Sequence, residues 1–176
     1  LKEEVIFERP LLEQIMDVVR LGVNIWGQER QEVAVHELIR AILQDKPIKM
    51  RQLADIFHIN VADIHDMWIL SCEKQQIERL RREGLPLLRE DLSHYCYTVV
   101  ADFYEGYLVA FLDWIEQGAE RERISRDLKN RLEGLSLEVA ITRFYPLEST
   151  ADVRRSFLLY HEMFSYAQKI WPARSL

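Results

Sequence analysis

Histidines and a neighbouring glutamate form the part of this sequence that is most similar to a zinc site. His36 and Glu37 begin like the His-Glu-x-x-His motif, in which two histidines hold the metal and the glutamate acts as a base. The second ligand position is occupied by Arg40, whose guanidinium cannot bind a cation. His58 and His65 lie on either side of an expected turn and complete no ligand set. The sequence therefore predicts no metal site and no cofactor.

An acidic turn is the second place where chemistry could occur. Glu105 and Gly106 lie between two segments rich in apolar and aromatic residues. Glycine allows the backbone to turn tightly or to approach a phosphate, and a carboxylate can hold a metal ion. Two-metal phosphate chemistry needs several oxygen ligands, and Glu105 has no carboxylate neighbour in the turn. We therefore expect plain turn residues, no catalytic residue and no enzyme activity.

Residues 50–70 have the residue pattern of a helix-turn-helix, which would bind DNA. A recognition helix beginning at Val61 would present Asp63 and Asp66 without any Lys or Arg. Carboxylates repel the phosphates of a nucleic acid, so this surface is poorly suited to DNA. A DNA-binding module at residues 50–70 is for this reason only an alternative and not the leading interpretation.

The composition predicts an ordered domain without a basic surface. Of 176 residues, 48% are hydrophobic, and the net charge of −6 argues against general nucleic-acid binding. Cys72 and Cys96 are in apolar contexts, which predicts buried thiols rather than a disulfide. No apolar run approaches the roughly 20 residues that span a bilayer. With no signal-peptide pattern at the N-terminus, we expect a cytoplasmic protein.

A predicted β-hairpin over 95–114 is central to the chain. Alternating residues in 97–102 predict its first strand, and the apolar run 108–112 predicts a second strand that is covered on both faces. The other predicted elements are helices over 50–58, 77–84, 85–95 and 121–135 and from Ser149 or Thr150 to 171, and strands over 67–72 and 137–144. With right-handed crossovers, this order predicts an α+β, ferredoxin-like fold: an antiparallel sheet with the crossover helices on one face.

A long helix is predicted over 10–44, ahead of the sheet, with a bend near Gly27. This helix would carry two apolar stripes, a first one before Gly27 and a second one over 35–43 that is out of phase with the first. We expect the first stripe to be a dimer seam, the alternative being that it folds back on the core of its own chain. The candidate residues of this dimer helix are Leu12, Ile15, Val19, Val23 and Trp26.

Two features resemble known families. The order of elements, with a hairpin after two helices, resembles the GGDEF nucleotidyl-cyclase fold. The segment 141–172 resembles the closing segment of PucR/CdaR-type transcriptional regulators, which control purine catabolism and sugar diacid utilisation, and 33–70 resembles the lead-in of that family. The positions that carry the likeness in 141–172 are Arg155, Ser156, Phe157, Ala167, Ile170 and Pro172.

The resemblance implies a linker or dimerisation helix over 1–46 and a degenerate GGDEF-like regulatory domain over 47–176. The stretch 103–107 keeps one glycine of the GGDEF turn, and the first strand lacks the Asp of the cyclases. A nucleotide-binding or cyclase-like relative stays an alternative. In the PucR/CdaR family a small-molecule sensor precedes this domain and a helix-turn-helix follows it. We therefore expect a homodimeric relay fragment that reaches DNA only through a domain this chain lacks.

Overall fold

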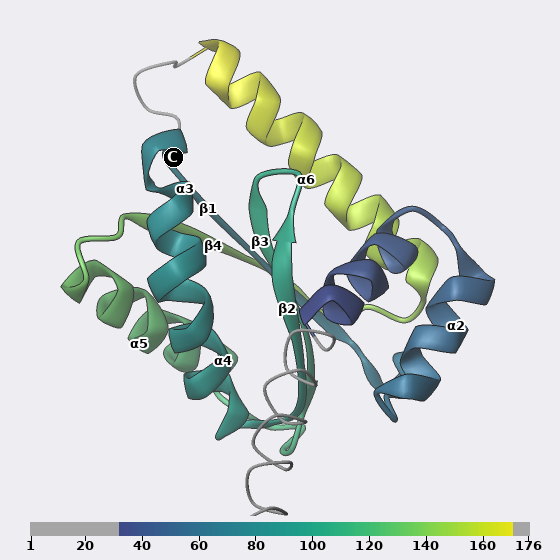
Figure 1. Cartoon of the computed structure of the whole chain (residues 1–176). Helices are drawn as coiled ribbons and strands as arrows, with labels where there is room; N and C mark the ends of the chain where they lie inside the picture. Colours follow the sequence, from purple (N-terminus) through teal and green to yellow (C-terminus); the bar gives the residue numbers. More distant parts are fainter. Residues whose placement is uncertain (1–31, 171–176) are drawn as a thin grey trace, which may run out of the picture. The chain divides into compact units, whose positions relative to one another are not determined.

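The computed structural model describes residues 32–170, and the chain divides into two compact units, Leu1–Ala34 and Val35–Leu176. The second unit contains one antiparallel sheet, in which the strands follow the order β2-β3-β1-β4 (Figure 1). The strands are β1 (Asp66–Cys72), β2 (Cys96–Tyr104), β3 (Tyr107–Trp114) and β4 (Val139–Phe144). All four lie where the apolar patterns predicted them.

Helices connect these strands. Two of them, α4 (Leu85–Ser93) and α5 (Arg121–Gly134), lie in the crossovers from β1 to β2 and from β3 to β4. This β-α-β-β-α-β succession, with its strand order, is that of ferredoxin-like folds, so the predicted α+β class is confirmed. The other described helices are one over 32–43, α2 (Pro47–Ile56), α3 (Ile77–Arg79), which a π-helical turn over Leu80–Gly84 joins to α4, and α6 (Thr150–Ile170).

Both faces of the sheet are covered. The crossover helices pack on one face, as predicted, while α6 and the helix over 32–43 pack on the other (Figure 1). Every residue of β1 is buried, and so is every residue of β3 except Asp113. Because successive side chains of a strand point to opposite faces, a strand covered on both sides needs apolar residues at almost every position. This requirement explains the unbroken apolar run in β3.

The turn between β2 and β3 consists of Glu105 and Gly106 alone, since Tyr104 pairs with Tyr107. Both turn residues have positive φ angles, 52° for Glu105 and 84° for Gly106. Two consecutive positive φ angles are typical of the type I′ turn, whose twist matches that of the flanking strands. The sequence left the turn type open because it contains neither Asn-Gly nor Asp-Gly.

Residues 50–70 do not fold as a helix-turn-helix. The helix α2 ends at Ile56, and the next helical segment is a single 3₁₀ turn over Val61–Asp63. The chain then enters β1 at Asp66. The recognition helix that this alternative requires is therefore not formed.

The helix over 32–43 belongs, from residue 35 onward, to the core of the sheet. Leu38, Ile39 and Ile42 are at most 1% exposed and pack in the same cluster as Phe111 of β3. The second predicted stripe therefore packs on the sheet of its own chain. The residues proposed for the dimer seam lie outside the described part of the chain and stay a prediction: Leu12, Ile15, Val19, Val23 and Trp26.

The two cysteines are buried free thiols, as predicted. Burial raises the pKa of Cys72 to about 11 and that of Cys96 to about 12, and nearby carboxylates add to both shifts. Both thiols are therefore protonated and unreactive at neutral pH. Among the helices of residues 32–170, none combines the length and the apolar content needed to cross a bilayer.

The substitution Phe111→Ala tests the central position of β3. The Phe111 side chain is fully buried, so its removal is expected to cost about 3–5 kcal/mol of unfolding free energy. Denaturant titration followed by circular dichroism measures this loss. The matched control is Tyr97→Ala on β2, where the side chain is 72% exposed and little change is expected. Equal stability of the two variants would contradict the packing described above.

Candidate functional site

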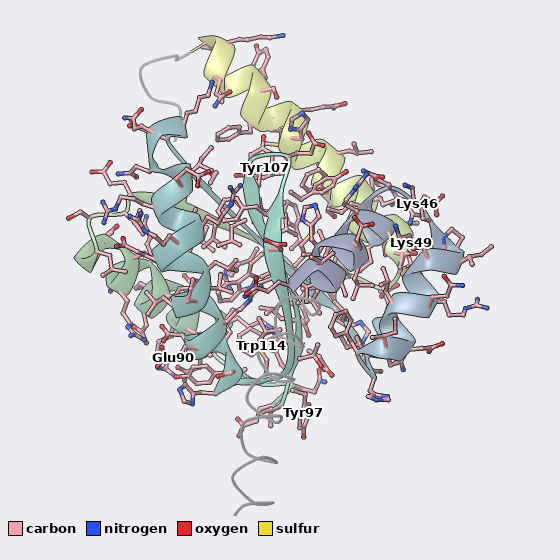
Figure 2. All side chains as sticks on the ribbon, viewed as in Figure 1. Lys46, Lys49, Glu90, Tyr97, Tyr107 and Trp114 are labelled. Carbon is pink, nitrogen blue, oxygen red and sulfur yellow. The ribbon has the colours of Figure 1, made fainter. Side chains whose placement is uncertain are left out.

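The hairpin turn, where the sequence contains its one candidate for phosphate chemistry, is flanked by buried aromatic rings. Phe103 packs in one core, and Tyr107 packs in the other, beside α6 (Figure 2). Burial, with smaller contributions from Tyr160 and Glu105, raises the pKa of Tyr107 to about 12, so its phenol stays neutral. Glu105 itself is exposed, and no group of three potential metal ligands occurs among the described residues. The turn thus offers one carboxylate.

The three histidines considered as ligands have no contact partner in common. His36 Nδ1 lies 3.2 Å from a carboxylate oxygen of Asp102 on β2. His65 donates through Nδ1 to the backbone carbonyl of Leu147, at 2.9 Å. His58 is exposed at the end of α2. The structure therefore brings none of them together.

An aromatic cluster fastens α6 to the sheet. The ring of Tyr107 meets Phe157, Tyr160 and Phe164 of α6 edge-on, at centroid distances of 5.3 to 6.0 Å. The Tyr160 hydroxyl donates to Ser71 Oγ of β1 at 2.8 Å. Burial raises the pKa of Tyr160, while the hydrogen bond to Ser71 partly opposes that rise. These contacts fix both the position of α6 and its rotation about its own axis.

A second set of contacts joins α6 to the helix over 32–43. Arg154 Nη1 donates to the backbone carbonyl of Ile42 at 3.4 Å and lies 3.3 Å from a carboxylate oxygen of Asp45. A cation at the C-terminal end of a helix satisfies a free carbonyl and interacts favourably with the helix dipole. We call these contacts of Arg154 with Ile42 and Asp45 the helix junction.

The helix over 32–43 also contacts the edge strand β2. Its His36 approaches Asp102, as described above, and Gln44 Nε2, just beyond its last turn, donates to the hydroxyl of Tyr104 at 3.2 Å. The apolar side of the helix is buried on the sheet. A displacement of this helix would therefore change the contacts both of α6 and of strand β2, which ends at Tyr104.

A cavity of about 240 Å³ lies beside the helix junction. Its walls combine apolar side chains of the helix over 32–43, α2, β3 and α6, among them Ile42, Met50, Phe111 and Val153. Ser149, which caps α6 by accepting from the amide of Asp152 at 3.2 Å, also lines this cavity. The sequence left the cap open between Ser149 and Thr150, and it did not indicate the cavity, since the cavity depends on packing between distant segments.

On the opposite face, a buried carboxylate ties α5 to β1. Asp66 is fully buried, and its Oδ2 accepts from Trp114 Nε1 at 2.7 Å and from Arg121 Nε at 2.9 Å. The guanidinium of Arg121 lies over the ring of Tyr145, 4.1 Å from its centroid. Burial raises the pKa of Asp66, and the bond from Trp114 and the charge of Arg121 oppose that rise. With its carboxylate enclosed in this way, the cluster is suited to holding the fold together.

The sequence did not reveal the partners of these side chains. The sequence suggested Asp66 only as part of a DNA-binding helix and Arg121 only as the first residue of the predicted helix over 121–135. The sequence predicted no role for Arg154, although this residue directly precedes the segment Arg155-Ser156-Phe157, which resembles the PucR/CdaR family. The separations along the chain, 55 residues for the Asp66 pair and 112 for Arg154 and Ile42, explain this gap.

Comparisons of the chain with protein-family models, with curated proteins and with solved structures found no match. The contacts of α6 and of the helix over 32–43 are accordingly the basis for a functional proposal.

The substitution Arg121→Ala tests the buried ion pair. Removing one partner leaves the Asp66 carboxylate buried without its cation, which costs about 3–5 kcal/mol of unfolding free energy. The pKa of the Asp66 carboxyl is raised in the folded state. Such a group makes the folded chain more stable while it is protonated at low pH, and this contribution to the unfolding free energy is lost as the pH rises through the folded pKa. The deficit should therefore grow from pH 4 to pH 7 in denaturant titrations.

Two controls accompany this measurement. Arg123→Ala removes an exposed guanidinium from the same helix and is expected to change the stability little at either pH. Adding Asp66→Asn to Arg121→Ala removes the unpaired charge and should abolish the pH dependence of the deficit. A deficit that is equal at both pH values would contradict the role assigned to Asp66.

Proposed function

We propose that this chain is the regulatory relay domain of a bacterial transcription regulator of the PucR/CdaR type. In this proposal a small-molecule sensor acts on the chain through its N-terminal helical region, and α6 passes the change to a separate DNA-binding domain. The protein is a cytoplasmic homodimer and has no enzyme activity. The same family resemblance supports a role in controlling purine catabolism or sugar diacid utilisation.

The helix junction is the observation that carries this proposal. Two helices that are more than a hundred residues apart in the chain pack on the same face of the sheet and meet through Arg154. A relay requires that a displacement at one element change the energy of the other, and coupling of this kind travels through contiguous packed contacts. The junction provides such a contact between Ile42 and α6.

The geometry of the hairpin supports the absence of catalysis. The turn between β2 and β3 has two residues, and nearby Phe103 and Tyr107 are packed in the two opposite cores. A cyclase-like alternative would need space for a nucleotide and several carboxylates around a metal at this turn. Glu105 supplies one carboxylate and has an exposed side chain.

A calorimetric titration with GTP and Mg²⁺ distinguishes these two functions. We expect no binding heat and no conversion of GTP by the purified protein, because the turn lacks a second glycine and a second acid. Conversion of GTP that disappears in Glu105→Ala would contradict the proposed function. It would favour the nucleotide-binding alternative.

Hydrogen exchange tests the relay itself. Ile42→Val removes one buried methylene from the helix over 32–43 and costs about 0.5–1.5 kcal/mol, too little to unfold the domain. We expect faster amide exchange in α6, and we expect this effect to shrink when Arg154→Ala is also present, because the junction is then broken. Exchange in α6 that is unchanged by Ile42→Val would contradict the relay.

The matched control is Ile124→Val. Ile124 is 4% exposed, lies on α5 on the opposite face of the sheet, and loses the same methylene. This variant is expected to leave exchange in α6 unchanged apart from any global change in stability. An equal response of α6 to both substitutions would mean that the coupling is global and does not depend on the junction.

A further inference from the structure

One side of α6 carries a regular stripe of exposed apolar residues. The steps between them are four, three and four residues, the spacing of the apolar positions in a two-helix seam. Side chains this large are 44% to 66% exposed here, although the opposite side of the same helix is buried on the sheet. A contiguous apolar stripe on a surface marks a site of association. The stripe consists of Leu159, Met163, Tyr166 and Ile170.

Two opposite charges border this stripe along one edge. Glu162 and Lys169 directly precede Met163 and Ile170, so both lie on the same flank of the seam. They are seven residues apart, about 10 Å along the helix axis, which is too far for them to form an ion pair with each other. Among the described residues neither takes part in an ion pair with another element. Within residues 32–170, each of these two charges beside the stripe is therefore without an ion-pair partner on another element.

We propose that α6 binds α6 of a second copy of this chain, in antiparallel orientation. In this arrangement Leu159 packs against the partner's Ile170, and Met163 packs against the partner's Tyr166, a favourable sulfur–aromatic contact. The same register sets Glu162 beside the partner's Lys169 and, by the two-fold symmetry, Lys169 beside the partner's Glu162. Two ion pairs thus flank a seam of four layers.

The charges decide between the two orientations. In a parallel pair the residues on this flank meet the opposite flank of the partner, where Ala167 follows Tyr166. Glu162 would then face a methyl group and gain nothing. The antiparallel pair uses both charges and all four apolar residues. The inference rests on the homodimer that the proposed function includes, names its surface, and is independent of the helix junction.

A charge exchange between two variants of the whole chain tests this seam. Glu162→Lys and Lys169→Glu each turn both ion pairs from attractive to repulsive, so each should raise the dimer dissociation constant roughly tenfold in sedimentation or light scattering. Mixing the two variants should restore the dimer, because the mixed pair again has opposite charges at both contacts. Lys129→Glu, a reversal of an exposed charge on α5, is the control and should change nothing.

A second variant tests the apolar stripe. Met163→Asp with Tyr166→Asp changes two exposed side chains, so it should give a folded monomer whose circular dichroism spectrum matches that of the parent and whose melting temperature no longer depends on protein concentration. The proposal would be overturned by a parent chain that is a monomer, or by a dimer whose dissociation constant is unchanged in these variants. It would also be overturned if a mixture of the two charge variants did not form the dimer again.

The other candidate seam gives a distinguishable result. A dimer that is lost in Val19→Glu with Trp26→Glu, yet is unaffected by every change in α6, overturns the α6 seam and leaves the homodimer of the proposed function standing. A parent chain that is a monomer removes both. The hydrogen-exchange response of α6 to Ile42→Val decides the relay independently of either outcome.

Discussion

The burial of β1 along its whole length is the constraint on which the rest of the structure depends. Strands pair with both of its edges, β3 on one side and β4 on the other, so its backbone groups are satisfied within the sheet. Its side chains point alternately to two faces, and each large apolar side chain contributes about 1.5–3 kcal/mol only if that face is covered. The helices α4 and α5 therefore cover one face, and α6 with the helix over 32–43 covers the other.

Apolar packing alone would allow the helices to slide or rotate on the sheet, and a few polar contacts select one arrangement. A buried polar group is costly unless it is hydrogen-bonded, so each buried pair specifies a position. Asp66 with Arg121 sets the start of α5 on one face, and Tyr160 with Ser71 sets α6 on the other. Arg154 then fixes where the helix over 32–43 ends beside α6.

The helix α6 is the element in which these constraints meet. Its inner side belongs to the core, its first turns hold the helix junction, and its outer side carries the apolar stripe bordered by Glu162 and Lys169. In the proposed regulator, one rigid helix would therefore connect the end of the helix over 32–43 of its own chain to a second copy. Because Tyr160 and Phe164 lock its rotation, a shift at the junction would be transmitted along the helix rather than absorbed by it.

The helices and strands of the sheet domain, and their order, could be predicted from the sequence, because side-chain periodicity is a local property of each helix or strand. The strand β3 could be assigned to the middle of the sheet from its unbroken apolar run, and the cap of the last helix could be narrowed to Ser149 or Thr150. Three contacts became visible only in the folded chain: residues 35–43 cover the sheet, Asp66 binds Arg121, and Arg154 binds the backbone of Ile42. These contacts join segments far apart in the chain, and no local pattern specifies which of many charged residues will come together when the chain folds.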